Sequence, residues 1–130
     1  MVQVQIYFDG GCQPNPGSGY GSYEVICHSN PEFRHKVSRQ KFGHMTNNMA
    51  EWNALLCALE WIGERAPSGE TQIDIFTDSM LVCQQLQGHW RCKQWYLREL
   101  RDGCLKLLYF CKKWSIKWHR RDNNVERFGH

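Results

Sequence analysis

Hydrophobic and polar residues alternate strictly along residues 2–9. The hydrophobic positions are Val2, Val4, Ile6 and Phe8, and the polar positions are Gln3, Gln5, Tyr7 and Asp9. A period of two residues over this length is typical of a β-strand with one buried face. Residues 10–17 are rich in glycine and proline, so we expect the strand to end at Asp9 and a turn to follow. The pattern places a carboxylate at the end of a strand, beside glycines that let a large group approach the backbone.

The remaining periodicity predicts further strands and helices. Alternation predicts strands at residues 20–27, 32–42, 72–78 and 115–120. Helices are expected at 50–62, 79–86 and 95–111, and residues 125–128 offer at most one or two helical turns after a break at 122–124. The first three strands form a meander, and strands 2–9 and 72–78 can lie parallel, joined by helix 50–62. This order predicts a single α/β domain over residues 1–130 with a mixed sheet.

Two more carboxylates stand at the ends of predicted elements. Glu51 lies in the expected first turn of helix 50–62, on the face that carries its apolar residues, where an unpaired charge is costly to bury. Asp78 is the last residue of strand 72–78, and parallel neighbours end at the same edge of a sheet. Asp9, Glu51 and Asp78 are therefore expected in one place. Three carboxylates repel one another unless cations join them, and hard oxygen ligands in this number suit Mg²⁺ or Mn²⁺.

Two of these carboxylates also have a purely structural explanation. An Asp such as Asp9 often caps a turn, and Glu51 can interact with the dipole at a helix N-terminus. For a single residue these explanations carry at least as much weight as the functional one. The predicted metal site therefore depends on the three residues occurring together.

The charge of the chain is unevenly distributed. The net charge is +3, but residues 1–87 hold 5 basic and 9 acidic residues, whereas residues 88–130 hold 11 basic and 4 acidic residues. An acidic half joined to a basic half suits a polyanion held against an acidic metal site. The basic, aromatic loop 88–95 contains Trp90, Lys93 and Trp95 and indicates a groove for a phosphate backbone. A solvated basic surface with core-anchoring tryptophans is the alternative.

Composition excludes several classes of protein. No apolar run approaches the roughly 20 residues that a membrane span needs, and the first residues lack the features of a signal peptide. The seven cysteines are scattered singly without zinc-ligand spacing, so we expect small core residues in a reduced compartment. These points predict a cytoplasmic protein that does not associate with membranes. The sequence indicates no protein partner, and we expect a monomer.

Four groups of residues, spread in order over almost the whole chain, resemble the type 1 ribonuclease H family. They are YFDGG at 7–11 with PNPG at 14–17, TNNMAE at 46–51, TDS at 77–79, and Trp118 with Arg121 and Asn124. The resemblance implies a ribonuclease H-like fold with a five-stranded mixed sheet flanked by helices. It also implies an endonuclease that hydrolyses the RNA strand of RNA/DNA hybrids with two divalent metal ions, leaving 5′-phosphate and 3′-hydroxyl ends. The chain looks like the catalytic domain alone.

The resemblance carries the metal ligands over residue by residue, with one departure. Asp9, Glu51 and Asp78 match three of the four acidic ligands of the family. At the fourth position the family has an Ala–Asp pair, whereas this chain has Arg127 and Phe128. We favour Asn124 as the fourth catalytic and metal-binding residue, because an amide oxygen is also a hard ligand. The alternatives are Glu126, Asp122 and His130.

The resemblance also implies the contacts with substrate. The matching positions are Asn15, Thr46, Asn47, Asn48 and Ser79, whose short donors and acceptors suit a shallow minor groove where 2′-hydroxyls distinguish RNA from DNA. Trp90, Lys93 and Trp95 are candidates for the channel of the DNA backbone. Two other functions stay open: a hybrid-binding module with little or no turnover, and another nuclease on the same fold.

Overall fold

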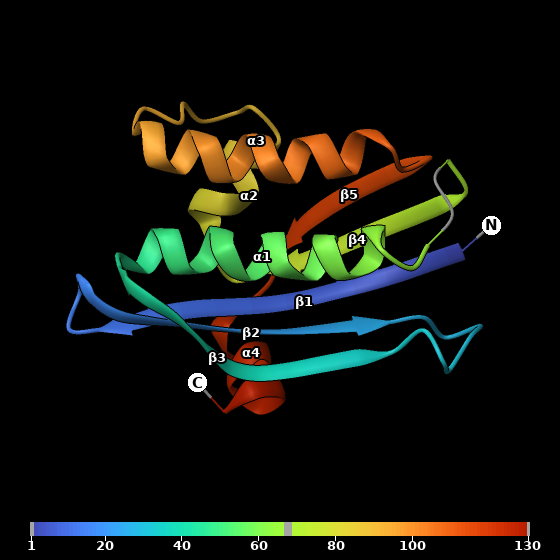
Figure 1. Cartoon of the computed structure of the whole chain (residues 1–130), viewed down its shortest axis with the longest axis horizontal. Coiled ribbons are helices and arrows are strands. Elements are labelled where there is room, and N and C mark those ends of the chain that lie inside the picture. The colour runs from blue at the N-terminus through green and yellow to red at the C-terminus, as the bar shows by residue number, and fades with distance from the viewer. Residues whose placement is uncertain (1, 67–68, 130) are drawn as a thin grey trace.

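The computed structural model describes residues 2–66 and 69–129. Along them run β1 (Val2–Gln13), β2 (Gly17–Ile26), β3 (His35–Met45), α1 (Asn47–Gly63), β4 (Thr71–Thr77), α2 (Met80–Leu86), α3 (Trp95–Tyr109), β5 (Lys113–Trp118) and α4 (Arg121–Phe128), as Figure 1 shows. The strands form one five-stranded sheet in the order β3-β2-β1-β4-β5. The predicted α/β class and five-stranded mixed sheet are confirmed.

Strand β1 lies at the centre of the sheet. It pairs antiparallel with β2 and parallel with β4. On either side, β2 pairs antiparallel with β3 and β4 pairs parallel with β5. The predicted meander and the predicted parallel pair are therefore confirmed. The β1–β4 ladder runs from Val2↔Thr71 to Tyr7↔Phe76. Asp9 and Asp78 each stand two residues beyond this last pair, so the register brings these two carboxylates to the same place.

The core lies between one face of the sheet and the helices α1, α2 and α3. Fully buried side chains of this core include Phe8, Trp52, Leu55, Ile75 and Leu97. Burial of each such side chain contributes roughly 1.5–3 kcal/mol to folding. Helix α4 lies against the other face, because Arg127 is stacked over Tyr7, whose side chain points away from that core.

The cysteines behave as small core residues, as the sequence predicts. All seven are free, and five of them are buried: Cys12, Cys27, Cys83, Cys92 and Cys104. Burial raises the pKa of the Cys83, Cys92 and Cys111 thiols and keeps them protonated. Among the described residues, no helix is both long enough and apolar enough to cross a bilayer.

The expectation that the first strand ends at Asp9 is wrong. Strand β1 continues to Gln13, because residues 10–13 pair with residues 18–21 of β2 and these ladder bonds hold the glycines in an extended conformation. The turn is confined to residues 14–16. Asp9 therefore lies inside a continuous strand, and the residues before and after it are paired with β2.

Helix α1 begins earlier than the sequence predicts. The hydroxyl of Thr46 caps it by accepting a hydrogen bond from the backbone N–H of Met49 at 3.2 Å, and the first helical residue is Asn47. Glu51 consequently stands in the second turn and not in the first. The unpaired N–H groups of the helix start are out of its immediate reach, so the helix dipole does less to offset its burial than the sequence suggests.

The predicted limits of the C-terminal elements are also shifted. The last strand is Lys113–Trp118 where residues 115–120 were predicted, and α3 ends at Tyr109. The strand does end before residues 122–124, but the last helix begins at Arg121, earlier than the predicted 125–128, so these residues belong to α4. Contacts distant in sequence fix this helix: Asn124 bonds to β1, and Arg127 forms an ion pair with the buried Glu24 of β2. Such contacts override the weak local helix propensity of asparagine.

The third strand is displaced toward the C-terminus, to His35–Met45 from the predicted 32–42. Asn30 extends the preceding turn, because its side-chain and backbone oxygens accept hydrogen bonds from the backbone of Glu32 and Phe33.

Candidate active site

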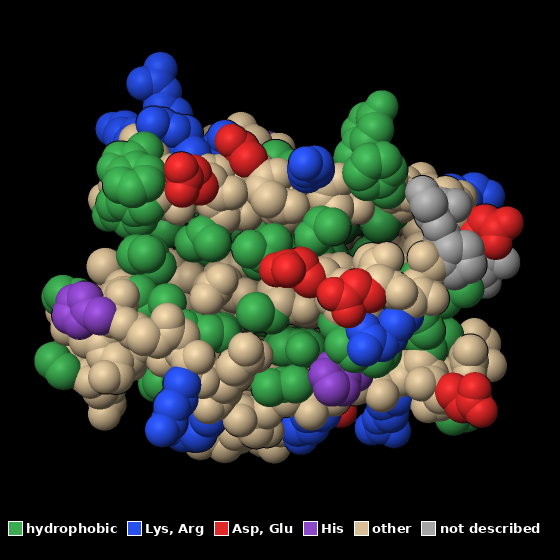
Figure 2. All heavy atoms as spheres, viewed as in Figure 1, with side chains coloured by type: hydrophobic (Ala, Val, Ile, Leu, Met, Phe, Trp, Pro, Cys, Tyr) green, Lys and Arg blue, Asp and Glu red, His purple; other side chains and the backbone are tan. Residues whose placement is uncertain are grey.

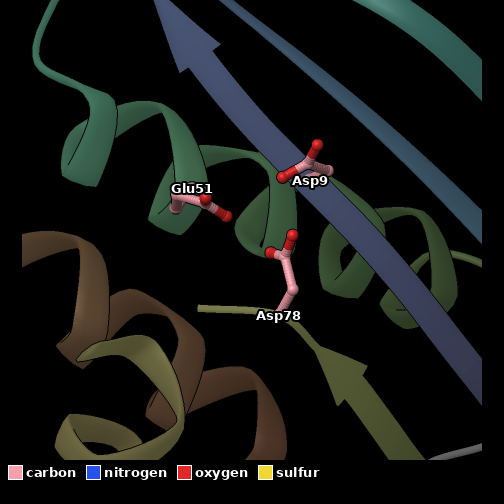
Figure 3. Close-up of side chains that lie close together, drawn as sticks. All are labelled: Asp9, Glu51 and Asp78. Atoms are coloured by element: carbon pink, nitrogen blue, oxygen red, sulfur yellow. The ribbon is translucent and has the colours of Figure 1, made fainter. Parts of the chain in front are cut away.

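Three carboxylates from three different elements converge beside the centre of the sheet. Asp9 lies in β1, Glu51 lies in α1, and Asp78 is the residue that follows β4. Figure 3 shows the three side chains pointing toward one another. One carboxylate oxygen of each lies within 4.8 Å of those of the other two. No second group of three His, Cys, Asp or Glu residues with this geometry is present in the described parts of the chain. The convergence predicted from the sequence is therefore observed.

Gly10 sets the distance between β1 and α1 at this point. A Cβ atom on residue 10 would collide with the backbone of Ala50 and with the backbone nitrogen of Glu51. The absence of a side chain lets the strand and the helix touch main chain to main chain. As a result the backbone N–H of Gly10 donates a hydrogen bond to the Glu51 carboxylate, which favours its charged form.

The site is electrostatically strained without cations. Burial raises the pKa of Glu51 well above its usual range, and the charges of Asp9 and Asp78 raise it further. Burial also raises the pKa of Asp78, with an added contribution from Asp9. Hydrogen bonding from Asn124 and electrostatic interactions with His119 and Arg121 act in the opposite direction on Asp78 but do not cancel the rise. The arrangement therefore favours any ligand that brings positive charge.

The residues present fit a divalent cation. Oxygen Oε2 of Glu51 is buried and has no hydrogen-bond partner among the described residues, which is costly for an anionic oxygen unless a cation meets it. The carboxylates line a cavity of about 240 Å³ together with Gly11, Asn47 and Arg121. Carboxylate oxygens are the ligands that Mg²⁺ and Mn²⁺ prefer. Three of them at this spacing form a candidate metal centre.

Among the fourth ligands considered within the described residues, Asn124 alone lies at the acidic cluster. It is fully buried, its amide Nδ2 donates to the backbone oxygen of Phe8 at 3.2 Å, and its side chain also donates to the Asp78 carboxylate. Its Oδ1 atom is buried and has no hydrogen-bond partner in the described part of the chain. The amide is thus fixed by its donors, while its acceptor oxygen is left for another group.

The alternatives to Asn124 lie elsewhere. Asp122 is exposed and pairs with Arg120 at 3.4 Å, and Glu126 lines a separate cleft on the far face of the sheet with Tyr7 and Lys36. His130 lies outside the described residues. Phe128, which stands where the family has its fourth acid, is buried, and Lys36 Nζ lies 5.9 Å from its ring centroid. That position contributes packing and no oxygen ligand.

Asparagines form a polar cluster beside the acidic cavity. The Oδ1 atom of Asn15 accepts from the backbone N–H of Asn47 at 3.1 Å, and Oδ1 of Asn47 accepts from the backbone N–H of Cys12 at 2.9 Å. Asn15, Thr46, Asn47 and Asn48 line a cleft of about 400 Å³ with Gln94 and Tyr96. Because Asn47 also lines the acidic cavity, the cleft and the cavity adjoin. Four of the five residues predicted to contact the minor groove are therefore brought together.

Ser79, the fifth of these residues, has a structural role as well. Its hydroxyl caps α2 by accepting from the backbone N–H of Val82 at 3.2 Å, and its own N–H donates to Thr77 Oγ1 at 3.0 Å. These bonds fix the short segment between β4 and α2 that carries Asp78. Ser79 lines neither the acidic cavity nor the asparagine cleft.

The basic loop, residues 88–94 between α2 and α3, lies at one end of the molecule. In Figure 2, Lys and Arg side chains gather where this loop meets the start of α3, beside exposed hydrophobic side chains. Trp90 is 47% exposed and Trp95 is 63% exposed, which excludes a role as core anchors. Lys93 is exposed and lines a cleft of about 500 Å³ with Arg91 and Arg98. The loop thus offers aromatic faces and cations to solvent.

Some residues of the site carried only a weak signal in the sequence. Arg121 and Cys12 line the acidic cavity, and the indole Nε1 of Trp118 donates to the backbone oxygen of Asp78 at 2.9 Å. Arg121 and Trp118 belong to the matching motif at the end of the chain, so the motif indicated them without indicating what they contact. Nothing in the sequence marked Cys12 or Tyr20, which reach the cavity because residues 10–13 continue the strand.

The sheet order, with an acidic cluster beside the two central parallel strands, defines a ribonuclease H-like α/β protein. Residues 7–126 match the family described as reverse transcriptase-like. The structure of RNase H1 from the halophilic archaeon Halobacterium salinarum superposes with a TM-score of 0.85 at 31% identity, covering 98% of this chain and 92% of that one. The chain therefore belongs to the type 1 ribonuclease H family, as the sequence resemblance predicts.

Two other relatives add to the comparison. The bifunctional protein Rv2228c of Mycobacterium tuberculosis is 31% identical over 125 residues, which cover 95% of this chain and 33% of that protein. LC11-RNase H1, solved in complex with an RNA/DNA hybrid, superposes with a TM-score of 0.82 at 25% identity over 95% of this chain and 89% of that chain. The chain spans 33% of the first of these relatives and 59% of the curated ribonuclease HI of Halobacterium salinarum.

Proposed function

We propose that residues 1–130 form one catalytic domain that hydrolyses the RNA strand of RNA/DNA hybrids, leaving 5′-phosphate and 3′-hydroxyl ends. The observation that carries this proposal is the acidic cluster of Asp9, Glu51 and Asp78 adjoining the asparagine cleft through Asn47. A relative of the same fold, LC11-RNase H1, has been solved with such a hybrid. In this proposal the acidic cluster carries out the reaction and the adjoining asparagine cleft recognises the sugar.

Asp9, Glu51 and Asp78 would hold two divalent ions, Mg²⁺ or Mn²⁺, with Asn124 as the fourth ligand through its free Oδ1. When bound, such ions supply the positive charge that activates a water and stabilises the leaving oxygen of a phosphodiester. The chain's own part is to fix the ligand oxygens. The backbone N–H of Gly10 restrains Glu51. Asn124 and Trp118 restrain Asp78, and the β1–β4 ladder, which ends at Tyr7↔Phe76, brings Asp9 near Asp78.

Other side chains bind and orient the substrate. Asn15, Thr46, Asn47, Asn48 and Ser79 present the short donors and acceptors that a shallow minor groove with 2′-hydroxyls requires. Trp90, Lys93 and Trp95 would receive the backbone of the DNA strand through stacking and charge. Arg121 contributes a permanent positive charge to the acidic cavity, where a phosphate approaches.

A second candidate function follows from Phe128. A site with one acid fewer than its relatives would suit a module that binds hybrids with little or no turnover. Cleavage of a labelled RNA/DNA hybrid in Mg²⁺ and in Mn²⁺ separates the two, because enzyme and binding module both retain the hybrid but only the enzyme shortens the RNA strand. Equal cleavage of single-stranded RNA or of DNA would instead indicate another nuclease on this fold. A cytoplasmic location, a monomeric state and the absence of a protein partner stay predictions from the sequence.

A further inference from the structure

The basic loop 88–94 is attached to the core by a buried polar side chain that the proposed chemistry does not use. Gln85, near the end of α2, is 5% exposed. Its Oε1 accepts a hydrogen bond from the indole Nε1 of Trp52 at 3.2 Å, and its Nε2 donates to the backbone oxygen of Arg91 at 3.1 Å. Trp52 itself is fully buried in α1. One amide therefore connects the centre of the core to the middle of the loop.

A second side chain holds the other half of the loop. Nη1 of Arg98, in the first turn of α3, donates to the backbone oxygen of Lys93 at 2.7 Å and to that of Cys92 at 3.4 Å. The Cys92 side chain, between the exposed Arg91 and Lys93, is buried in the core. The loop is thus held by its backbone at three consecutive residues, while the two cationic side chains on either side of Cys92 remain in solvent.

The start of the loop is held in the same way. The backbone oxygen of Gln84 accepts from the N–H groups of His89 and Trp90, at 2.9 and 3.2 Å. A surface loop of seven residues with this many hydrogen bonds to its flanking helices is more restrained than loops in general. These hydrogen bonds end on backbone oxygens, so the cationic groups of Arg91 and Lys93 stay available. The bonds therefore position these groups without neutralising their charge.

We propose that Gln85 is a positioning residue for substrate binding, which couples the Trp52 indole to the loop and holds Arg91 and Lys93 where a nucleic-acid phosphate backbone passes. Arg98 supports it from α3. The inference rests on the proposed function for the identity of the polyanion. A backbone that is already held in place loses less conformational entropy when the cations bind, so removal of the hydrogen bonds from Gln85 and Arg98 should weaken binding and leave the chemical step intact.

The test compares variants that release the loop with one that only weakens the core. Gln85→Met removes both hydrogen bonds at similar volume, and Gln85→Glu keeps an acceptor for Trp52 but removes the donor to Arg91. Arg98→Lys keeps the charge and removes the paired hydrogen bonds to the loop backbone. Ile75→Val, at a fully buried core position of β4, is the control for stability alone. All four are measured for KM and kcat on a labelled hybrid, for salt dependence of binding, and for amide hydrogen exchange of residues 88–94.

We expect KM to rise roughly fivefold in Gln85→Met, Gln85→Glu and Arg98→Lys with kcat unchanged, because each loses about one net hydrogen bond. The slope of log affinity against log salt should become shallower by about 0.9 for each phosphate that the loop no longer reaches. Exchange in the loop should accelerate in these variants and not in Ile75→Val. If Gln85→Met does not fold, Arg98→Lys still decides the matter, since Arg98 is exposed.

Native KM, native salt slope and native loop exchange in Gln85→Met and Arg98→Lys would overturn the inference. An equal rise of KM in Ile75→Val would overturn it as well, because general loss of stability would then account for the effect. Failure of the native protein to bind or cleave hybrid would instead count against the proposed function. Amide hydrogen exchange of residues 88–94 needs no substrate, so in that case it still shows whether Gln85 restrains the loop.

Discussion

The indole of Trp118 donates a hydrogen bond to the backbone carbonyl oxygen of Asp78 across 2.9 Å. The bond joins β5 to the residue just after β4, where the chain leaves the sheet and no ladder bond restrains it. Asp78 is thus held through its backbone by Trp118 and through its side chain by Asn124. A carboxylate that must meet two others within a few ångströms depends on such restraints.

Trp118→Phe should lower kcat on hybrid by about tenfold with little change in KM, because small displacements of a positioned group are costly to catalysis. Trp114→Phe is the matched control, since Trp114 lies on the same strand but packs against the core. Steady-state kinetics of both variants check the prediction. Equal losses in the two would show that β5 stability, and not the bond to Asp78, is responsible.

Asp78→Asn should abolish cleavage while hybrid binding and fold remain, because it removes charge at the acidic cluster with almost no change in shape. Losses of roughly 10³-fold or more are expected for removal of a group essential to the chemical step. The control is Asp74→Asn, on the same strand, whose carboxylate accepts from Ser115 at 2.8 Å away from the site. Substantial turnover in Asp78→Asn would show that Asp78 is not an essential metal ligand.

Metal binding should strengthen as pH rises beyond the range of ordinary carboxyl groups. Burial and neighbouring carboxylates raise the pKa of Glu51 well above its usual range and also raise that of Asp78, so protons compete with the metal at higher pH. Calorimetric titration with Mn²⁺ at several pH values measures this. A metal affinity that is already constant above pH of about 5 would contradict the prediction.

The same raised pKa values fix the sign of a stability effect in chelator. The folded protein binds protons more tightly than the unfolded chain, so stability falls as pH rises from the usual carboxyl range to the raised pKa values. Glu51→Gln should remove most of this loss and stabilise the metal-free protein at neutral pH, because the amide carries no charge to bury. Thermal unfolding of both proteins in chelator tests it, with Glu60→Gln on the exposed side of α1 as the control.

Binding of hybrid should weaken steeply with salt. Replacement of Arg91 and Lys93 by glutamine should make the slope of log affinity against log salt shallower by about 0.9 per residue, because each phosphate contact releases counterions. Lys113→Gln, an exposed lysine of β5, should leave it unchanged. If Lys113→Gln has the same effect as the loop variants, net charge alone and not the basic loop governs binding.

Asn124→Ala should reduce activity far more than Glu126→Ala, because Asn124 contacts Asp78 and β1 whereas Glu126 lies in a separate cleft. A neutral fourth ligand leaves the site with one negative charge fewer, so activity is expected to favour Mn²⁺, which binds mixed ligand sets more tightly than Mg²⁺. Metal titrations of cleavage in both variants measure this. A fully active Asn124→Ala beside an inactive Glu126→Ala would reverse the assignment.

The acidic cluster was predictable from the sequence because each carboxylate stands at a distinctive place in a regular pattern. Asp9 and Asp78 are the last residues of alternating segments, and Glu51 breaks the apolar face of a helix. The continuation of β1 to Gln13 was not predictable, since glycines are extended here only because β2 pairs with them. Asn124 bonds to a partner 116 residues away, and Gln85 bonds to a partner 33 residues away. No local sequence pattern encodes either contact.

The contact at Gly10 makes the spacing of two carboxylates less dependent on the core side chains. Asp9 and Glu51 adjoin the point where the main chain of β1 meets the main chain of α1, and no side chain at Gly10 takes part in that contact. Hydrophobic residues away from this contact can therefore change during divergence with less effect on the spacing of the two carboxylates. Such tolerance is in keeping with a relative that shares 31% of its residues and still superposes with a TM-score of 0.85.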